Sequence, residues 1–242
     1  MKAIELVSYR PLIITVGTET ANELSTFDAG AAYTRYLHDQ VGDFPSIPLG
    51  DVVEVGRESV NPRSPRHAEV DFDYVDLREV DDIYGQVLAF RRVKGDQIGS
   101  TKVRFRKGDI LFAKIMPSLA NKKIALVTQD VTNAVASTEF IVLRPKRDSA
   151  IDSYFLFRAL RSDPFTEQAV ANVTGATGRQ RLSPAVLLSL RIPRPPEPLQ
   201  QELSSVVARE FTLRSDAAEL TKQADDLAVA LVGTTTLRTA RY

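Results

Sequence analysis

Apolar residues recur at a regular spacing near the C-terminal end of the chain. From Leu199 to Leu231, ten positions follow one another at alternating intervals of four and three residues, and all except Glu210 are apolar. A repeat that averages 3.5 residues keeps one stripe of a helix facing a neighbouring helix, so the pattern predicts a long coiled-coil helix. The apolar positions of this seam are Leu199, Leu203, Val206, Leu213, Ala217, Leu220, Ala224, Leu227 and Leu231. The alternative is a helix that packs on its own domain.

Prolines divide the chain into three parts. Four prolines between Ile192 and Leu199 exclude helix there and separate the seam from the preceding domain. Pro45 and Pro48 mark an earlier boundary. We therefore expect an N-terminal helical arm over 1–45, with a helix over 29–41. A central domain over 46–196 and a long spacer or dimerisation helix with a short tail over 197–242 complete the expected organisation.

The central part alternates between short apolar runs and turn residues, which is typical of a domain with a mixed β core. Strands are predicted over 102–105, 110–115, 123–127 and 139–143. Helices are predicted over 153–161, 163–173 and 184–190, because Asp152, Asp163 and Ser183 can cap them and prolines follow two of these caps. The expected fold class is therefore α/β (α+β), followed by one long C-terminal helix.

Composition narrows the function classes. The chain has no cysteine and two histidines, His38 and His67, which lie far apart in the sequence. The sequence therefore lacks the residues for a thiol nucleophile or a zinc finger, and its two distant histidines give little support to a histidine-based triad. No glycine-rich cofactor loop follows a strand, and no run of about 18 apolar residues could span a membrane. We expect a cytoplasmic protein that is not an enzyme and holds no metal or cofactor.

The charge is balanced overall but unevenly distributed. Lys and Arg number 31, as do Asp and Glu. Residues 69–82 hold seven acids and one base, and are expected to form a solvated acidic loop. Residues 91–123 hold ten bases and two acids, and residues 174–196 hold four arginines and no acid. Two basic segments on a neutral chain indicate a localised anionic partner.

Nucleic acid fits these basic segments. Lys102, Arg104 and Arg106 alternate with apolar residues, so a strand would project them together while Val103 and Phe105 enter the core. A solvated strand face is the equally simple alternative. Two loops add amides, hydroxyls and bases of the types that bind phosphates and base edges. The candidate DNA contacts are Lys102, Arg104, Arg106, Lys107, Lys114, Ser118, Asn121, Lys122, Lys123, Thr177, Arg179, Gln180 and Arg181.

The order of several segments resembles the specificity subunits of type I restriction–modification systems. The similar segments are Pro48–Val52, Phe105–Ile115, Ala136–Pro145, Thr174–Pro184 and the junction from Arg191 to Gln201, with a further similar element at Phe27–Ala29. The resemblance runs from about residue 27 to residue 231. Full members have two recognition domains and two spacer helices, whereas this chain has one of each.

The resemblance implies a division of labour. A specificity subunit reads double-stranded DNA and docks a modification subunit, which binds S-adenosylmethionine and methylates an adenine flipped from the duplex. The same resemblance is also compatible with a restriction subunit, a nuclease and translocase, in the complex. By the same resemblance we expect an antiparallel homodimer through the C-terminal helix. Two other classes stay open: a stand-alone DNA-binding or regulatory protein, and an assembly module that works through its heptad helix.

Overall fold

Strands from the whole central region assemble into two main sheets and a small one. The computed structural model describes residues 44–176 and 178–239, with side chains through Val232. The four-stranded sheet is antiparallel throughout, in the order β2 (Val53–Val55), β10 (Phe140–Pro145), β7 (Ile110–Ala113) and β8 (Ile124–Leu126). The five-stranded sheet has the order β3 (Ser59–Val60), β6 (Lys102–Arg104), β9 (Val135–Ala136), β4 (Asp71–Val75) and β5 (Arg91–Lys94). All four predicted strands are confirmed.

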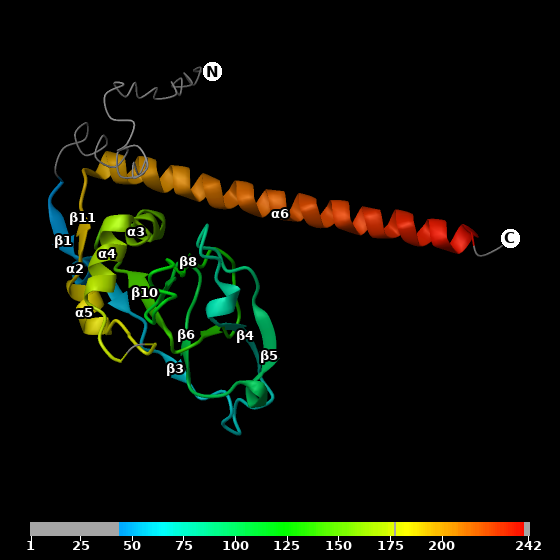
Figure 1. The fold of residues 1–242 in the computed structure, drawn as a ribbon, viewed down its shortest axis with the longest axis horizontal. Coiled ribbons are helices and arrows are strands. Elements are labelled where there is room, and N and C mark those ends of the chain that lie inside the picture. The colour runs from blue at the N-terminus through cyan, green and yellow to red at the C-terminus, as the bar shows by residue number, and fades with distance from the viewer. Residues whose placement is uncertain (1–43, 177, 240–242) are drawn as a thin grey trace, which may run out of the picture. The chain divides into compact units, whose positions relative to one another are not determined.

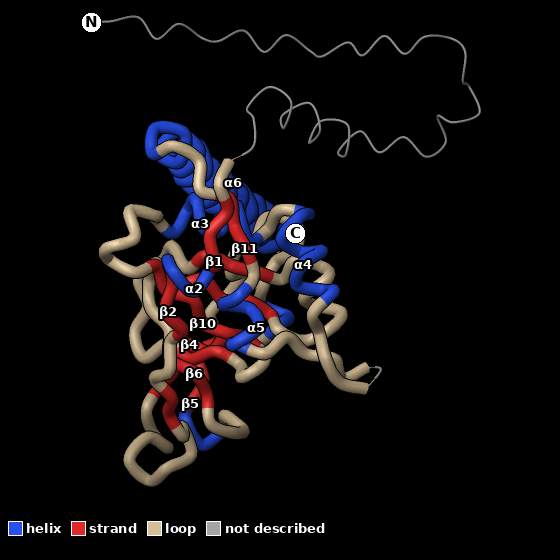
Figure 2. Tube along the Cα trace, turned by 90° about the vertical axis from the view of Figure 1, so that its left-hand side faces the viewer, coloured by secondary structure: helices blue, strands red, loops and turns tan. Residues whose placement is uncertain are grey.

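The remaining elements connect and cover these sheets. Among the described strands, only β4 and β9 pair in parallel, and β1 (Ser46–Pro48) pairs with β11 (Arg191–Pro193) in a separate ribbon. Helices gather around the four-stranded sheet, whereas the five-stranded sheet lies at the end of the domain away from α6 (Figures 1 and 2). The helices are α2 (Leu49–Val52), α3 (Ser153–Leu160), α4 (Asp163–Ala171), α5 (Pro184–Ser189) and α6 (Glu197–Thr239), with 3₁₀ turns η2 (Leu77–Glu79) and η3 (Gly95–Gln97).

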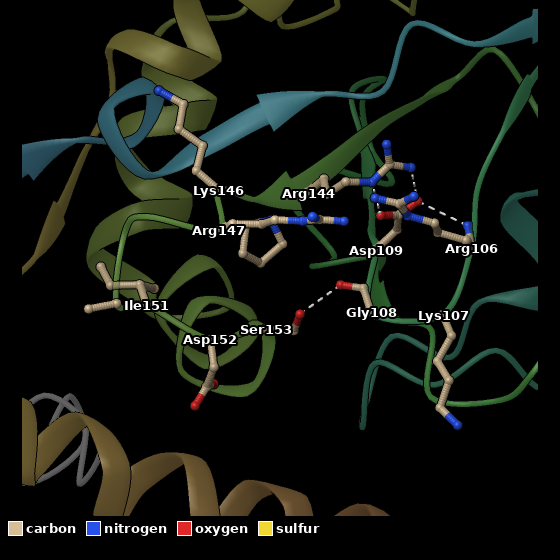
Figure 3. A pocket seen from close by; sticks show the side chains of 12 residues that line it. Arg106, Lys107, Gly108, Asp109, Arg144, Lys146, Arg147, Ile151, Asp152 and Ser153 are labelled. Atoms are coloured by element: carbon tan, nitrogen blue, oxygen red, sulfur yellow. Dashed lines mark hydrogen bonds and ion pairs between the residues drawn. The ribbon is translucent and has the colours of Figure 1, made fainter.

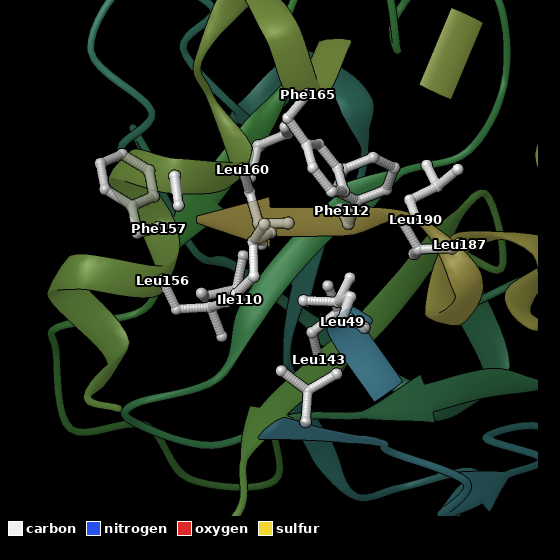
Figure 4. Close-up of a cluster of buried hydrophobic side chains, with 14 of the residues drawn as sticks. Leu49, Ile110, Phe112, Leu143, Leu156, Phe157, Leu160, Phe165, Leu187 and Leu190 are labelled. Atoms are coloured by element: carbon white, nitrogen blue, oxygen red, sulfur yellow. The ribbon is translucent and has the colours of Figure 1, made fainter. Parts of the chain in front are cut away.

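Strand β7 is covered on both faces and therefore contributes to two of the hydrophobic clusters. Successive side chains of a strand point to opposite faces. Ile110 and Phe112 pack with α3, α4 and α5 in the cluster of Figure 4, where Phe112 meets Phe165 edge-to-face at 6.2 Å. Leu111 and Ala113 instead pack toward the five-stranded sheet, with Phe105 in the same cluster. This explains why β7 is an unbroken apolar run and not an alternating one.

Local caps start helices α3, α4 and α5 as predicted, apart from one shift. Asp152 accepts hydrogen bonds from the backbone N–H groups of the first turn of α3, at 2.8 and 2.9 Å. Ser183 accepts one from Val186 at 3.2 Å at the start of α5. The cap of α4 is Ser162, one residue before the predicted Asp163. The shift follows from Pro164, which occupies the second helical position, where its missing N–H costs no hydrogen bond.

The predicted long helix is confirmed, and it uses a different face to contact the domain. Val207 and Phe211 are buried, and Phe211 lies edge-to-face with Phe157 of α3 at 5.4 Å. The interrupting position Glu210 forms ion pairs with Arg158 and Arg214. The alternative of a helix packed on its own domain therefore holds only for the N-terminal part of α6. Beyond that point α6 continues past the domain (Figure 1).

Most of the heptad seam is exposed along the described helix. The exposed fraction is 40% at Leu199, 56% at Leu213, 65% at Leu220 and 68% at Leu231, whereas Leu203 is partly buried against the domain core. A seam of this length in contact with water is unfavourable for an isolated chain.

Other predictions need correction or lie outside the described residues. The acidic run is not a solvated loop, because Asp71–Val75 is strand β4 and Glu79 is 6% exposed beside Arg91. The predicted arm over 1–45 lies outside the described residues except at its end, as do its helix over 29–41 and Thr177. In the part of the chain that the structure describes, none of the helices combines the length and apolar character that a bilayer span requires.

Candidate nucleic-acid interface

The basic loop over 174–181 is fastened beside the end of β7. Thr174 and Arg181 form a β-bridge that closes the loop, and Arg181 forms a second bridge with Ile115. The backbone N–H of Met116 donates to the carbonyl of Gln180 at 3.0 Å. Gly175 and Gly178 have φ values of +115° and +79°, which suit glycine and allow the chain to reverse. Two predicted contact segments, 114–123 and 174–181, therefore lie side by side.

An ion pair holds the base of this loop. Arg181 donates from Nε and Nη2 to the two carboxylate oxygens of Glu139, at 3.1 and 2.9 Å. The hydrogen bond from Arg181 is the main reason that the pKa of Glu139 lies below its usual value, and the nearby Lys114 adds to the effect. Arg179 remains exposed at the tip of the loop. Glu139 thus positions Arg181, and Lys114 and Arg179 supply the accessible positive charge.

Asp76 connects this region to the five-stranded sheet. Its carboxylate accepts a hydrogen bond from the Tyr74 hydroxyl at 3.1 Å. Burial, and then the charge of Asp76, raise the pKa of Tyr74 to about 12. The same carboxylate acts on Lys102 and on Glu139, although burial outweighs it and lowers the pKa of Lys102. The charge of Asp76 therefore acts on both Lys102 and Glu139.

The orientation predicted for the basic strand is partly wrong. Val103 and Phe105 do enter the core between the sheets. Lys102, however, is 6% exposed, and its ammonium donates to the Ser100 carbonyl and hydroxyl at 3.1 and 3.0 Å. Arg104 is half-buried over the Phe72 ring. Both side chains lie on the predicted face, but the polar and aromatic neighbours on that face cover them.

Two lysines of the 116–123 loop are held by the protein itself. Lys123 donates to the carbonyls of Leu77 and Val80 at 3.0 and 2.9 Å. Lys122 forms an ion pair with Asp163 at the start of α4. In the same loop, Ser118 is half-buried and Asn121 is exposed. DNA contact by these four residues stays a prediction. Either lysine would have to give up its contacts within the protein before it could bind DNA.

Arg106 and Lys107 belong to a second basic region that the charge pattern did not predict. They border a surface hollow of about 450 Å³ together with Arg144, Lys146 and Arg147 (Figure 3). Lys107 pairs with Asp130 at 2.9 Å on the surface. The feature of the sequence that could have indicated this region is the run Arg144–Arg147, which has three bases in four residues. Only the tertiary structure brings this run beside Arg106.

The described residues contain no group of three or more His, Asp or Glu side chains arranged to hold a metal ion. His67 shares a hydrogen bond of 3.0 Å with the Ser64 hydroxyl and lies edge-to-face with Phe72. His38 lies outside the described residues. The described surface thus offers basic and amide groups rather than a set of metal ligands.

Comparisons with known proteins point to one family. Residues 42–209 match the family model for the type I restriction modification DNA specificity domain. The chain is 29% identical over 127 residues to the type I restriction enzyme EcoDI specificity subunit of Escherichia coli. It is 33% identical over 131 residues to the HindI specificity subunit of Haemophilus influenzae. These stretches cover 52% and 53% of this chain but only 26% and 27% of the two relatives.

Solved structures share the fold. The HsdS subunit from Thermoanaerobacter tengcongensis matches with a TM-score of 0.58 and 27% identity, over 73% of this chain and 43% of that one. A second chain comes from a structure described as the basis of complex assembly and conformational transition of the type I R-M system. It matches with a TM-score of 0.59 and 26% identity, over 77% of this chain and 47% of that one. The chain therefore spans less than half the length of either neighbour. The expected fold class is confirmed.

Proposed function

The chain belongs to the family of type I restriction–modification DNA specificity domains, and from this premise we propose that it recognises a duplex DNA sequence and positions a separate adenine methyltransferase there. The observation that carries the proposal is the family match over 42–209, which includes every strand of the domain and the basic loop at Arg179. The family is a DNA specificity domain, and the relatives are specificity subunits, so the expectation of a non-catalytic role is confirmed.

The loop surface provides a physical basis for recognition. Arg179 is exposed, Gln180 is half-buried, and two glycines in the loop let its backbone approach a groove closely. Arginine suits guanine and glutamine suits adenine in the major groove, while Lys114 supplies charge for phosphate. The Glu139–Arg181 pair holds the loop in place before DNA arrives, so less conformational entropy is lost on binding. In this proposal residues 46–196 read the DNA.

In this proposal, partner subunits carry out the methylation and the cleavage of DNA. One structural neighbour comes from work on complex assembly in a type I R-M system, and this supports a methyltransferase subunit as the principal partner. A restriction subunit that cleaves and translocates would join the same complex. Both would act on DNA in the cytoplasm.

A second proposal concerns the exposed seam of α6. We infer that a second copy of the chain covers it in an antiparallel pair, which would place one reader at each end of the helices. The support is the seam itself, with Leu213, Leu220 and Leu227 all more than half exposed. Two identical readers related by a two-fold axis would recognise a palindromic, bipartite site.

Purification of the tagged chain from its native cells tests the main proposal. We expect a DNA methyltransferase subunit to copurify, and the complex to methylate adenine in a defined subset of DNA sequences. A stand-alone regulator would instead bind DNA tightly with no methyltransferase. An assembly module would keep its activity when Lys114 and Arg179 are replaced by glutamate.

A further inference from the structure

The hollow of Figure 3 lies at the meeting point of three segments. The turn after β6 contributes Arg106, the end of β10 and the turn after it contribute Arg144 and Arg147, and the start of α3 contributes Ser153. The Ser153 hydroxyl donates to the carbonyl of Gly108 at 2.7 Å, which joins two of these segments. The hollow therefore has a defined frame, although its parts are up to 47 residues apart in sequence.

Arg144 forms the floor of the hollow and is already neutralised. Its Nε and Nη2 donate to the two carboxylate oxygens of Asp109 at 2.7 and 2.8 Å, and Asp109 is 1% exposed. Asp109 also accepts a hydrogen bond from the backbone N–H of Arg106 at 2.9 Å. Glu54 and Glu58 lie 3.8 and 3.9 Å from the outer side of Arg144. Arg144 and the backbone N–H of Arg106 therefore already occupy both oxygens of the buried carboxylate.

Two guanidinium groups remain available. Arg106 and Arg147 are exposed, and the side chain of neither forms an ion pair or hydrogen bond with a described residue. Figure 3 shows them reaching toward Asp109 and Arg144 from opposite sides. The carboxylate of Asp152 points away and caps α3, so it does not compete for them. Two unpaired arginines around an open hollow favour an anion with several acceptor oxygens.

The basic surface extends beyond a single anion site. Arg106 and Arg144 also line a second hollow of about 200 Å³, together with Arg104, Asn133 and Glu58. Arginines and an amide around two neighbouring hollows suit a repeating chain of phosphates better than one small anion. On the proposed function of the domain, that chain is the backbone of duplex DNA.

We propose that the hollow between Arg106 and Arg147 binds a phosphate of the DNA backbone, as a contact additional to the 174–181 loop. This inference rests on the proposed DNA recognition. A phosphate contact positions the domain on the duplex without reading bases. Its loss therefore weakens binding to target and non-target sequences by the same factor.

The test uses the full chain with the substitutions Arg106→Ala, Arg147→Ala and both together. Affinity for a target and a non-target duplex is measured over a series of salt concentrations. The double substitution removes one phosphate contact and should flatten the log–log salt slope by about one unit, and each single substitution should produce part of that change. Arg147→Lys should keep most of the slope, since lysine still pairs with phosphate. Arg209→Ala is the matched control, because it removes an equal charge from the exposed side of α6.

The outcomes separate the two proposals. If the wild-type chain binds DNA and both alanine variants keep the slope of Arg209→Ala, the hollow has no role while DNA recognition stands. A loss confined to the target sequence would make these arginines readers of bases and would also overturn the phosphate site. If the wild-type chain does not bind DNA, the proposed recognition fails and the phosphate contact fails with it.

Discussion

Arg181 and Glu139 join the basic loop to the turn before β10 through two parallel hydrogen bonds, 3.1 and 2.9 Å long. The two residues are 42 positions apart in the sequence. Because each guanidinium nitrogen faces one carboxylate oxygen, the pair fixes the orientation of the loop as well as its position. Removal of this salt bridge should therefore change the stability of the domain.

Glu139→Gln should lower stability in a pH-dependent way. The folded-state pKa of Glu139 lies below its usual 4.5, mainly because of the hydrogen bond from Arg181. The stabilisation is therefore present above about pH 4.5 and is lost as the pH falls through the lowered pKa. Urea unfolding at several pH values should show the variant less stable at neutral pH, with the difference shrinking in acid. Glu202→Gln on the exposed side of α6 is the control, and a difference that is constant with pH would contradict the prediction.

Lys114→Ala and Arg179→Ala should weaken DNA binding through electrostatics. If both side chains contact phosphates, each substitution should flatten the log–log salt slope by about one unit. Neither side chain has an ion-pair partner among the described residues, so the fold should keep its thermal stability. The measurement is a salt series of binding titrations, with Arg209→Ala as the control. Unchanged slopes in both variants would remove these residues from the interface.

Lys123→Ala should destabilise the domain. Its ammonium donates to two backbone carbonyls, of Leu77 and Val80, which the substitution leaves without this donor. Losing a charged donor to partly buried acceptors costs about 1–3 kcal/mol. Urea denaturation measures the change. Lys107→Ala is the matched control, because its ion pair with Asp130 is exposed and should contribute at most about 1 kcal/mol. Equal losses for the two variants would be inconsistent with a structural role for Lys123.

Leu213→Lys combined with Leu220→Lys should convert a dimer into a monomer. Both side chains lie on the exposed seam, where burial of an ammonium in a helix–helix contact is unfavourable. Sedimentation should report the change, and binding to a bipartite site should weaken more than binding to a half-site. The control adds the same charge elsewhere on α6, as Ser215→Lys with Ala218→Lys, outside the seam. A wild-type chain that sediments as a monomer at micromolar concentration, with no partner present, would refute the pairing.

Local order was predictable from the sequence because its causes are local. Asp152 and Ser183 start helices through bonds to backbone groups two or three residues away. Val103 and Phe105 enter the core because a strand alternates its faces. The 3.5-residue repeat predicted a long helix with an apolar stripe, and α6 has both. The resemblance in motif order added the family, which composition and charge did not specify.

The tertiary structure alone decided which charges are available. Lys102, Lys122 and Lys123 look equivalent to Arg179 in the sequence, yet the first three are taken up by buried or paired contacts. The partners of Lys123 lie 46 and 43 residues away. Arg144 likewise pairs with Asp109, 35 residues away, whereas the Arg147 side chain has no ion-pair or hydrogen-bond partner among the described residues. The sequence shows how many ionisable groups each segment has, but only folding determines which groups become neighbours. The electrostatic effect of a charge at the surface depends on those neighbours and on its burial.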